Sequence, residues 1–137
     1  MATMSKYKEN ECDKLVQQIA IATISQWSGR PAECGHHIIH RGSILWRWRL
    51  MNIAPLTIEE HSMTHAKLLN PLFDWQKEMF QNHRHDLLER YLHEHNLIRD
   101  EFVNQAYEYL KQVKYDLEHN LTKWEDVIKK ERAKWED

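Results

Sequence analysis

Residues that form turns are scarce in this chain: glycine and proline occur only three times each among 137 residues. A sheet-rich fold needs such residues at its turns, roughly every ten positions, so the composition favours helices. Hydrophobic residues make up 42% of the chain and include six tryptophans, which is enough to bury a core and argues against general disorder. The length corresponds to one domain, or to a small domain with a helical extension.

An amphipathic stretch near the N-terminus predicts a helix over residues 11–27. Gly29 and Pro31 end it, because glycine suits the left-handed position after a helix and proline cannot continue the hydrogen-bond ladder. The expected buried positions of this helix include Leu15, Ile19, Ile24 and Trp27.

Two short strands are expected next, and they would form a small hairpin. The run CGHHIIHR at 34–41 contains two β-branched isoleucines, and a loop follows at Gly42. The second strand covers about 52–56 and ends at or just after Pro55. These runs are too short for hydrophobic periodicity to support them strongly.

A helix start follows the second strand. Thr57 and Glu60 have the spacing of a capping box, in which each side chain accepts a hydrogen bond from the other residue's backbone amide. The helix opened by this box carries His61 and His65 four positions apart, on one face.

The rest of the chain is predicted to be helical in about three pieces. Asn70 before Pro71 marks one helix start, and Thr122 with Glu125 forms a second capping box that opens the last helix. Over 100–118 the residues that form a stripe of helical period are Phe102, Ala106, Tyr109, Leu110, Val113 and Leu117.

The last segment has its own apolar stripe of Trp124, Ile128 and Trp135. This stripe either docks on the preceding helix, which we favour, or forms the seam of a homodimer through the C-terminal helices. The predicted fold is therefore mostly α with a small β-hairpin. Residues 1–69 hold an N-terminal helix and the hairpin core, and 70–137 form a helical extension.

Charge is distributed unevenly although the formal net charge is only -2. Residues 1–69 hold eight Lys and Arg against six Asp and Glu, whereas 70–137 hold eleven against fifteen. Between Glu33 and Glu59 there is no acidic residue, while Arg41, Arg47 and Arg49 all lie there. Such a segment is suited to a phosphate backbone, because an interspersed carboxylate would repel it; the alternative is a chance gap in a mixed surface.

The two cysteines, Cys12 and Cys34, form no Cys-x-x-Cys pair. This excludes a four-thiolate zinc site. With two cysteines in a chain of this length, we do not expect disulfides to hold the fold together. No apolar run approaches the ~20 residues that span a bilayer, and no hydrophobic signal segment precedes the first amphipathic stretch. We expect a soluble protein of the cytoplasm of a bacterium or a phage-infected host cell, with no membrane partner.

Histidine is unusually frequent, with ten copies. Those expected to be solvated surface residues, scattered among charges, are His83, His85, His93, His95 and His119. By contrast, two adjacent histidines near a strand end precede a capped helix with a histidine pair. Folding that helix against the hairpin would bring three imidazoles together, and three His with an open position form a catalytic metal arrangement. On spacing alone, a closed metal site and unliganded surface histidines remain alternatives.

The segment HHIIHRGSILWRWRLMNIAPLTIEEHSMTH, residues 36–65, resembles the HNH, or ββα-metal, endonuclease motif. Its spacing is similar to that of the DNase colicin and pyocin nuclease domains. In that family two adjacent histidines precede an asparagine and then a His-x-x-x-His helix. The matching positions here are His36, His37, Asn52, His61 and His65, and the likeness covers about a quarter of the chain.

By motif position, the resemblance implies that His36, His61 and His65 bind one divalent metal ion. It implies that His37 is the general base that takes a proton from the attacking water, and an ordinary imidazole pKa near 6.5 suits that role. The metal would stabilise charge on the phosphate and on the departing 3′ oxygen. Asn52 would hydrogen-bond across the loop and hold the base histidine, since a neutral amide bridges backbone groups without competing for the cation.

Candidate contacts to nucleic acid come from the same segment. Arg forms a fixed fork that matches two phosphate oxygens, and the candidates are Arg41, Arg47, Arg49 and Arg30. The alternative is that one or two of them pair with helix carboxylates. His40 is a candidate substrate contact and Trp46 and Trp48 are candidates for base stacking, although we favour a non-functional role for His40 and core positions for the tryptophans.

The flanking sequence also resembles the phage NinG (Rap) recombination nucleases, which cut branched DNA. The residues that carry this likeness are ECGH at 33–36, Arg47, Trp48, Asn52, Ile53 and Pro55. The likeness extends loosely into the helical C-terminal part. Those proteins carry additional cysteines and a Cys-Asn pair where this chain has His61 and its neighbours.

Together these features predict a metal-dependent HNH endonuclease that hydrolyses DNA phosphodiester bonds, with RNA as another substrate that the same chemistry allows. Three imidazoles favour Zn²⁺ or Ni²⁺ for tight binding, whereas Mg²⁺ or Mn²⁺ are candidates for turnover. The alternative is an inactive, metal-stabilised DNA-binding or protein-interaction module on the same fold. His37 favours an enzyme, because a structural metal site needs no base beside its ligands.

Overall fold

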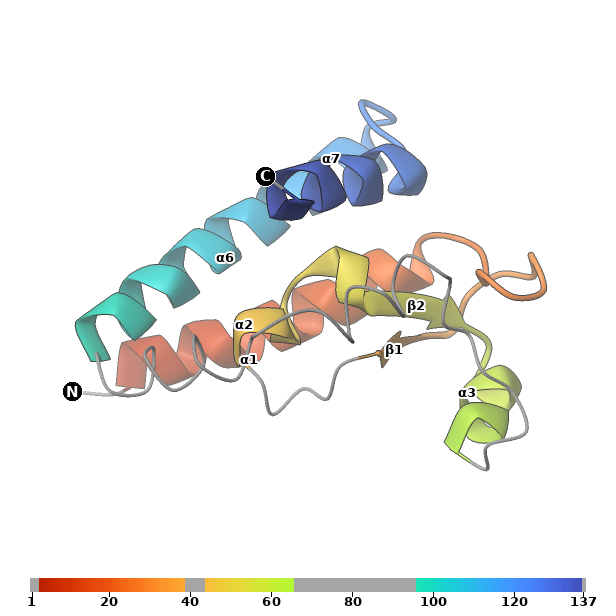
Figure 1. Ribbon diagram of the computed structural model, residues 1–137, viewed down its shortest axis with the longest axis horizontal. Helices are drawn as coiled ribbons and strands as arrows, with labels where there is room; N and C mark the ends of the chain where they lie inside the picture. Colours follow the sequence, from red (N-terminus) through yellow and green to blue (C-terminus); the bar gives the residue numbers. More distant parts are fainter. Residues whose placement is uncertain (1–2, 39–43, 66–95, 137) are drawn as a thin grey trace.

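The computed structural model describes residues 3–38, 44–65 and 96–136. In these ranges the protein is mostly helical with one small antiparallel hairpin, as predicted. The elements in chain order are α1 (Thr3–Ile21), β1 (Cys34–His37), α2 (Ile44–Arg47), the 3-10 helix η1 (Leu50–Asn52), β2 (Ile53–Leu56), α3 (Ile58–His65), α6 (Asn96–Glu118) and α7 (Trp124–Glu136). Figure 1 shows α6 lying against α1, with α3 at the far end of the hairpin. The helix start predicted at Pro71 lies outside the described residues.

α1 begins and ends earlier than the sequence pattern predicted, since it spans Thr3–Ile21 rather than 11–27. Its first turns are polar and carry no apolar stripe, although the lysines and glutamates there are good helix formers. Leu15 and Ile19 are buried, as expected, and they face the core together with Cys12. The buried face of the helix was therefore predicted better than its bounds.

The prediction for the end of this helix was wrong, because residues 24–31 form a loop of their own. Ile24 and Pro31 pair in an isolated bridge that closes the loop. Gly29 has a φ of 77°, the left-handed conformation that glycine adopts without steric cost. Ile24 and Trp27, which were expected to be buried, are 50% and 57% exposed.

The hairpin places both adjacent histidines on β1. β1 and β2 are antiparallel, with His36 opposite Ala54 and His37 opposite Ile53. β2 begins one residue later than predicted and ends as predicted. β1 ends at His37 instead of continuing to 41, and residues 39–43 lie outside the described part of the chain.

Gly35 allows α1 to approach the hairpin closely. A Cβ atom added at Gly35 would lie 2.8 Å from Ile53 Cγ2 and 2.9 Å from Ala20 Cβ. Both distances are shorter than carbon atoms tolerate, and neither neighbour is the end of a long flexible side chain. The absence of a side chain at this position therefore sets the distance between the helix and the strand that carries the histidines.

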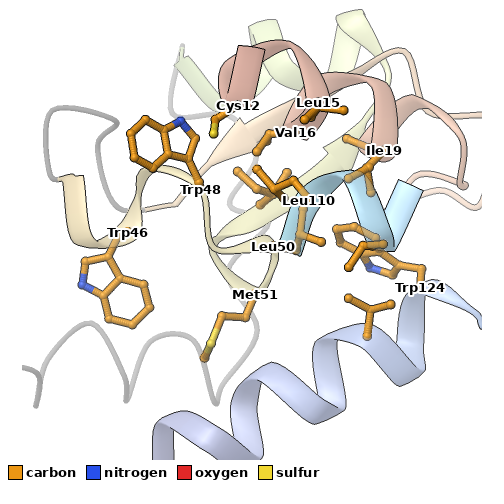
Figure 2. Close-up of a cluster of buried hydrophobic side chains, with 14 of the residues drawn as sticks. Cys12, Leu15, Val16, Ile19, Trp46, Trp48, Leu50, Met51, Leu110 and Trp124 are labelled. Carbon is orange, nitrogen blue, oxygen red and sulfur yellow. The ribbon is translucent and has the colours of Figure 1, made fainter. Parts of the chain in front are cut away.

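One hydrophobic core joins elements from both halves of the chain. Figure 2 shows Cys12, Leu15 and Val16 of α1 in the same cluster as Leu110 and Trp124. The predicted stripe on α6 is confirmed. Its buried members are Leu110 and Val113, and Phe102, Ala106, Tyr109 and Leu117 pack against the core while partly buried.

α7 packs on this core, so its apolar stripe docks within the chain as we favoured, although its main backbone contacts are with η1 and not with the preceding helix, α6. Trp124 is 5% exposed, and Ile128 packs against the core while partly buried. The helix begins one residue later than predicted. Its first helical hydrogen bond runs from Val127 N to Lys123 O (3.1 Å), so Lys123 takes the N-cap position expected for Thr122. The side chain of Trp135 lies outside the described part.

Glu131 of α7 is a buried carboxylate that connects three elements. It accepts hydrogen bonds from Met51 N of η1 (3.0 Å) and from the Tyr109 hydroxyl of α6 (2.6 Å). Burial raises the pKa of Glu131, and the Tyr109 hydrogen bond and the charge of Arg49 oppose that rise. Burial likewise lowers the pKa of Arg49, against the effect of Glu131. α7 is thus held to the segment that precedes β2 by polar contacts as well as by apolar packing.

Candidate functional site

The fold brings together two of the histidines selected from the sequence. His36 lies on β1 and His61 on α3, and their ring centroids are 5.2 Å apart with the ring planes tilted by 59°. α3 contacts both strands of the hairpin, so the three elements form a ββα unit. One histidine comes from the first strand of this unit and the other from its helix.

The predicted capping box that begins α3 is confirmed. Glu60 N donates to Thr57 Oγ1 (3.1 Å), and Thr57 N donates to Glu60 Oε1 (2.9 Å). Because Glu60 precedes His61 directly, the same contacts set the rotation of the helix that presents His61 to β1. Local sequence is sufficient to specify this part of the site.

Glu60 also binds the loop over residues 24–31, which the sequence did not reveal. The Ser25 hydroxyl donates to Glu60 Oε1 (2.5 Å), and Arg30 Nη2 lies 3.6 Å from Glu60 Oε2. Burial works to raise the pKa of Glu60, but hydrogen bonds from Ser25, Ser28 and Thr57 outweigh it and lower the pKa to about 2. An ionised Glu60 therefore joins the loop to the start of α3.

Replacing Glu60 with glutamine is expected to lower the free energy of unfolding by about 1–3 kcal/mol at neutral pH, because the carboxylate that accepts these hydrogen bonds is lost. The pKa of Glu60 is about 2 in the folded protein and has its ordinary value of 4.5 when unfolded. Its stabilising effect is therefore complete above pH ~4.5 and is lost as the pH falls towards 2. Urea unfolding at pH 7 and pH 3 measures both effects.

Exposed Glu59 offers a matched control, since Glu59→Gln changes the same charge one position away. It is expected to leave the unfolding free energy within about 0.5 kcal/mol of the wild type. An equal difference between wild type and Glu60→Gln at pH 7 and pH 3 would contradict the assigned role of the ionised carboxylate.

The predicted third ligand, His65, is the last residue of α3, one turn after His61. Its side chain lies outside the described part of the structure. Among the side chains that are described, no group of three or more His, Cys, Asp or Glu residues is arranged to hold a metal ion. The described geometry thus contains one pair of the predicted ligands, and the three-histidine site stays a prediction.

His37 makes a hydrogen bond that determines its tautomer. Its Nε2 lies 3.0 Å from the backbone oxygen of Arg47. A carbonyl can only accept, so Nε2 must carry a proton, and in the neutral ring the basic lone pair then falls on Nδ1. The imidazole that the motif assigns as general base is therefore oriented by the last residue of α2.

Asn52 is fully buried and bridges the loop between the two strands. Its Nδ2 donates to Trp46 O (3.2 Å), its backbone oxygen accepts from Ile38 N (2.9 Å), and its backbone amide donates to Arg49 O (3.0 Å). The contact with Ile38 lies directly after His37. This geometry agrees with the loop-bridging role that the resemblance implied for the asparagine.

The three candidate phosphate contacts that the structure describes all lie beside carboxylates of the protein. Arg47 forms a two-pronged ion pair with Asp13 of α1, which is the alternative that the sequence left open. Arg49 is partly buried near Glu131. Arg30 has a side chain 59% exposed beside Glu60, and Arg41 lies outside the described residues.

The aromatic residues of the same segment belong to the core. Trp46 is fully buried and Trp48 is 3% exposed, so the interpretation as core residues is confirmed over base stacking. His40 lies outside the described residues. Of the five histidines expected on the surface, the structure describes His119, which is exposed and stacks on Tyr115 with ring centroids 4.0 Å apart.

Asp13 and Glu131 were not selected from the sequence, although both contact the segment that surrounds the histidines. The one available signal was charge: Glu9 and Asp13 lie one helical turn apart on α1, and the segment that they contact contains arginines but no acid. That complementarity could have suggested the pairing with Arg47. No comparable pattern marks Glu131.

Comparison with known proteins found no similar protein. No family model matches the chain, and no curated protein and no solved structure is significantly similar to it. None of the described helices is long and apolar enough to cross a membrane. The HNH resemblance is therefore still carried by the residues of the motif and by the ββα arrangement alone.

Proposed function

We propose that this protein is a metal-dependent endonuclease of the HNH type that hydrolyses phosphodiester bonds of DNA. The observation that carries the proposal is the 5.2 Å separation of the His36 and His61 rings across the ββα unit. Two imidazoles bound to one tetrahedral ion, with each nitrogen about 2 Å from it, have centroids roughly 5 Å apart. The spacing thus fits a shared divalent cation.

His36 and His61 would hold the ion, with His65 from the next turn of α3 as the third ligand. A neutral, nitrogen-rich donor set suits Zn²⁺ or Ni²⁺ for tight binding and leaves Mg²⁺ or Mn²⁺ as candidates for turnover. When bound, the ion would stabilise negative charge on the phosphate and on the departing oxygen.

His37 would act on the attacking water. With its proton on Nε2, its Nδ1 accepts a proton as the water oxygen forms a bond to phosphorus. The bond from phosphorus to the 3′ oxygen breaks, and that oxygen takes a proton from a solvent water. Asn52 supports this geometry, because it joins the backbone next to His37 to the loop that holds the ring.

The arginines that were candidate substrate contacts now have different proposed roles. Arg47 is paired with Asp13 and Glu9 and supports the protein's own structure. Arg30 stays a candidate phosphate contact, because its side chain is exposed next to the start of α3 even though it lies beside Glu60. Arg41 keeps its predicted role from the sequence.

The proposal is tested by metal binding and plasmid nicking with the same protein. Zinc titration by calorimetry is expected to show one ion per chain, and His61→Ala is expected to bind about a hundredfold more weakly, since each ligand of such a site contributes a few kcal/mol. Supercoiled plasmid is expected to be nicked with Zn²⁺, Ni²⁺, Mg²⁺ or Mn²⁺ and to stay intact with chelator.

His119→Ala is the matched control, because it removes an exposed imidazole directly after the end of α6. Equal zinc affinity for wild type and His61→Ala would overturn the proposed metal site. Tight zinc binding without cleavage of supercoiled, linear or branched DNA would overturn the enzyme and leave the inactive binding module.

A further inference from the structure

Arg47 is held by α1 through a carboxylate that the proposed reaction does not use. Asp13 Oδ1 accepts from Arg47 Nε at 2.9 Å, and Asp13 Oδ2 accepts from Arg47 Nη2 at 2.5 Å. The Trp48 indole donates to the same Asp13 Oδ1 (2.9 Å), and Glu9 lies 3.7 Å from Arg47 Nη1. The Asp13 and Arg47 side chains are 26% and 15% exposed, so water weakens this pair less than it would an open surface pair.

The same residue, Arg47, presents its backbone oxygen to His37. Arg47 is the last residue of α2, a helix of only four residues that is followed by an irregular turn into η1. A helix this short cannot hold its own position, because it has almost no internal hydrogen bonds. The location of the Arg47 carbonyl is therefore set by side-chain anchors, and of the two carboxylates beside the guanidinium Asp13 forms the two-pronged contact.

We propose that Asp13 is a positioning residue for His37 and acts through Arg47. The carboxylate holds the guanidinium, the guanidinium holds the backbone of Arg47, and the Arg47 carbonyl holds Nε2–H of His37. This chain of contacts keeps the lone pair of the neutral ring on Nδ1, the atom that takes the proton in the proposed reaction. The inference rests on the proposed nuclease function, and its first readout does not require cleavage.

That readout is the tautomer of His37, measured by nitrogen-15 NMR at an alkaline pH where the ring signals no longer change with pH. Wild type is expected to show the Nε2–H form. Asp13→Asn keeps the size of the side chain but loses its charge, and it is expected to move the His37 signals towards a mixture of both tautomers. Arg47→Lys is expected to give the same shift, because lysine cannot form the two-pronged contact while the backbone carbonyl is retained.

The second readout is the split between kcat and KM for plasmid nicking. Displacing a reacting group by about 1 Å costs roughly a hundredfold in rate, so both variants are expected to lower kcat by about tenfold to a hundredfold with KM within twofold of the wild type. Glu11→Gln is the matched control, because Glu11 lies on the same helix and pairs with Lys14 instead of Arg47. It is expected to change neither readout.

The outcomes separate this inference from the proposed function. If the wild type cleaves no DNA, the nuclease proposal fails, and the His37 tautomer still tests the positioning by Asp13. If Asp13→Asn and Arg47→Lys both keep the wild-type His37 signals, the inference is overturned, whether or not kcat falls. If Asp13→Asn does not fold, Arg47→Lys alone decides.

Discussion

Replacing His37 with alanine is expected to lower the rate of plasmid nicking by about a hundredfold to ten-thousandfold, the usual range for loss of a general base. The hydrogen bond from Nε2 to the Arg47 carbonyl leaves Nδ1 as the basic atom of the neutral ring. Zinc affinity is expected to stay within a few-fold of the wild type, because His36 and His61 are retained. Nicking rates at saturating metal, together with calorimetry, measure both properties.

A structural effect of the same substitution can be separated from a catalytic one. The lost hydrogen bond to Arg47 is worth about 1 kcal/mol, so His37→Ala is expected to remain folded at the assay temperature. His119→Ala provides the control for removal of an imidazole at an exposed position. Cleavage by His37→Ala at the wild-type rate would remove His37 from the mechanism while leaving the metal site intact.

Replacing Glu131 with alanine is expected to have the largest effect on stability, about 2–4 kcal/mol, because the buried Met51 amide and the Tyr109 hydroxyl both lose their acceptor. The carboxylate accepts from Met51 N and the Tyr109 hydroxyl, and it opposes the effect of burial on the pKa of Arg49. Without this carboxylate, Met51 N and the Tyr109 hydroxyl lose their acceptor, and Arg49 loses a nearby negative charge, where α7 meets α6 and η1. Denaturant unfolding measures the change.

Glu131→Gln separates the charge from the hydrogen bonds. Glutamine keeps one acceptor oxygen and the size of the side chain, so the expected loss is about 1–2 kcal/mol. Glu125→Gln, at an exposed position in the first turn of α7, is expected to change stability by less than about 0.5 kcal/mol. A loss at Glu131→Ala no larger than at Glu125→Gln would contradict the assigned role.

Where the sequence predicted the fold well, the deciding interactions are local. The capping box of Thr57 and Glu60 formed as expected because its partners are three positions apart. The stripe on α6 followed from helical period for the same reason. Hairpin position was predicted within a few residues, since β2 directly precedes the capped helix.

Where prediction failed, the deciding contacts are distant. The pattern placed the end of the first helix at Trp27, whereas α1 ends at Ile21 and the following loop is held by Ser25 against Glu60, 35 positions away. No periodicity within residues 11–27 contains that information. The exposure of Trp27 follows from the same loop.

The same distinction between local and distant contacts applies to the candidate site. The sequence by itself determined the order and spacing of His36, His37, Asn52, His61 and His65, together with the hairpin and the cap that carry them. The tertiary structure alone decided which histidines meet, and which arginine side chains are exposed. Arg47 is bound to a carboxylate 34 positions earlier, and Met51 to one 80 positions later. Capping and strand pairing act between residues close in the sequence, so a short stretch of sequence predicts them. The ion pairs and the buried carboxylate depend on residues that only the folded chain brings together.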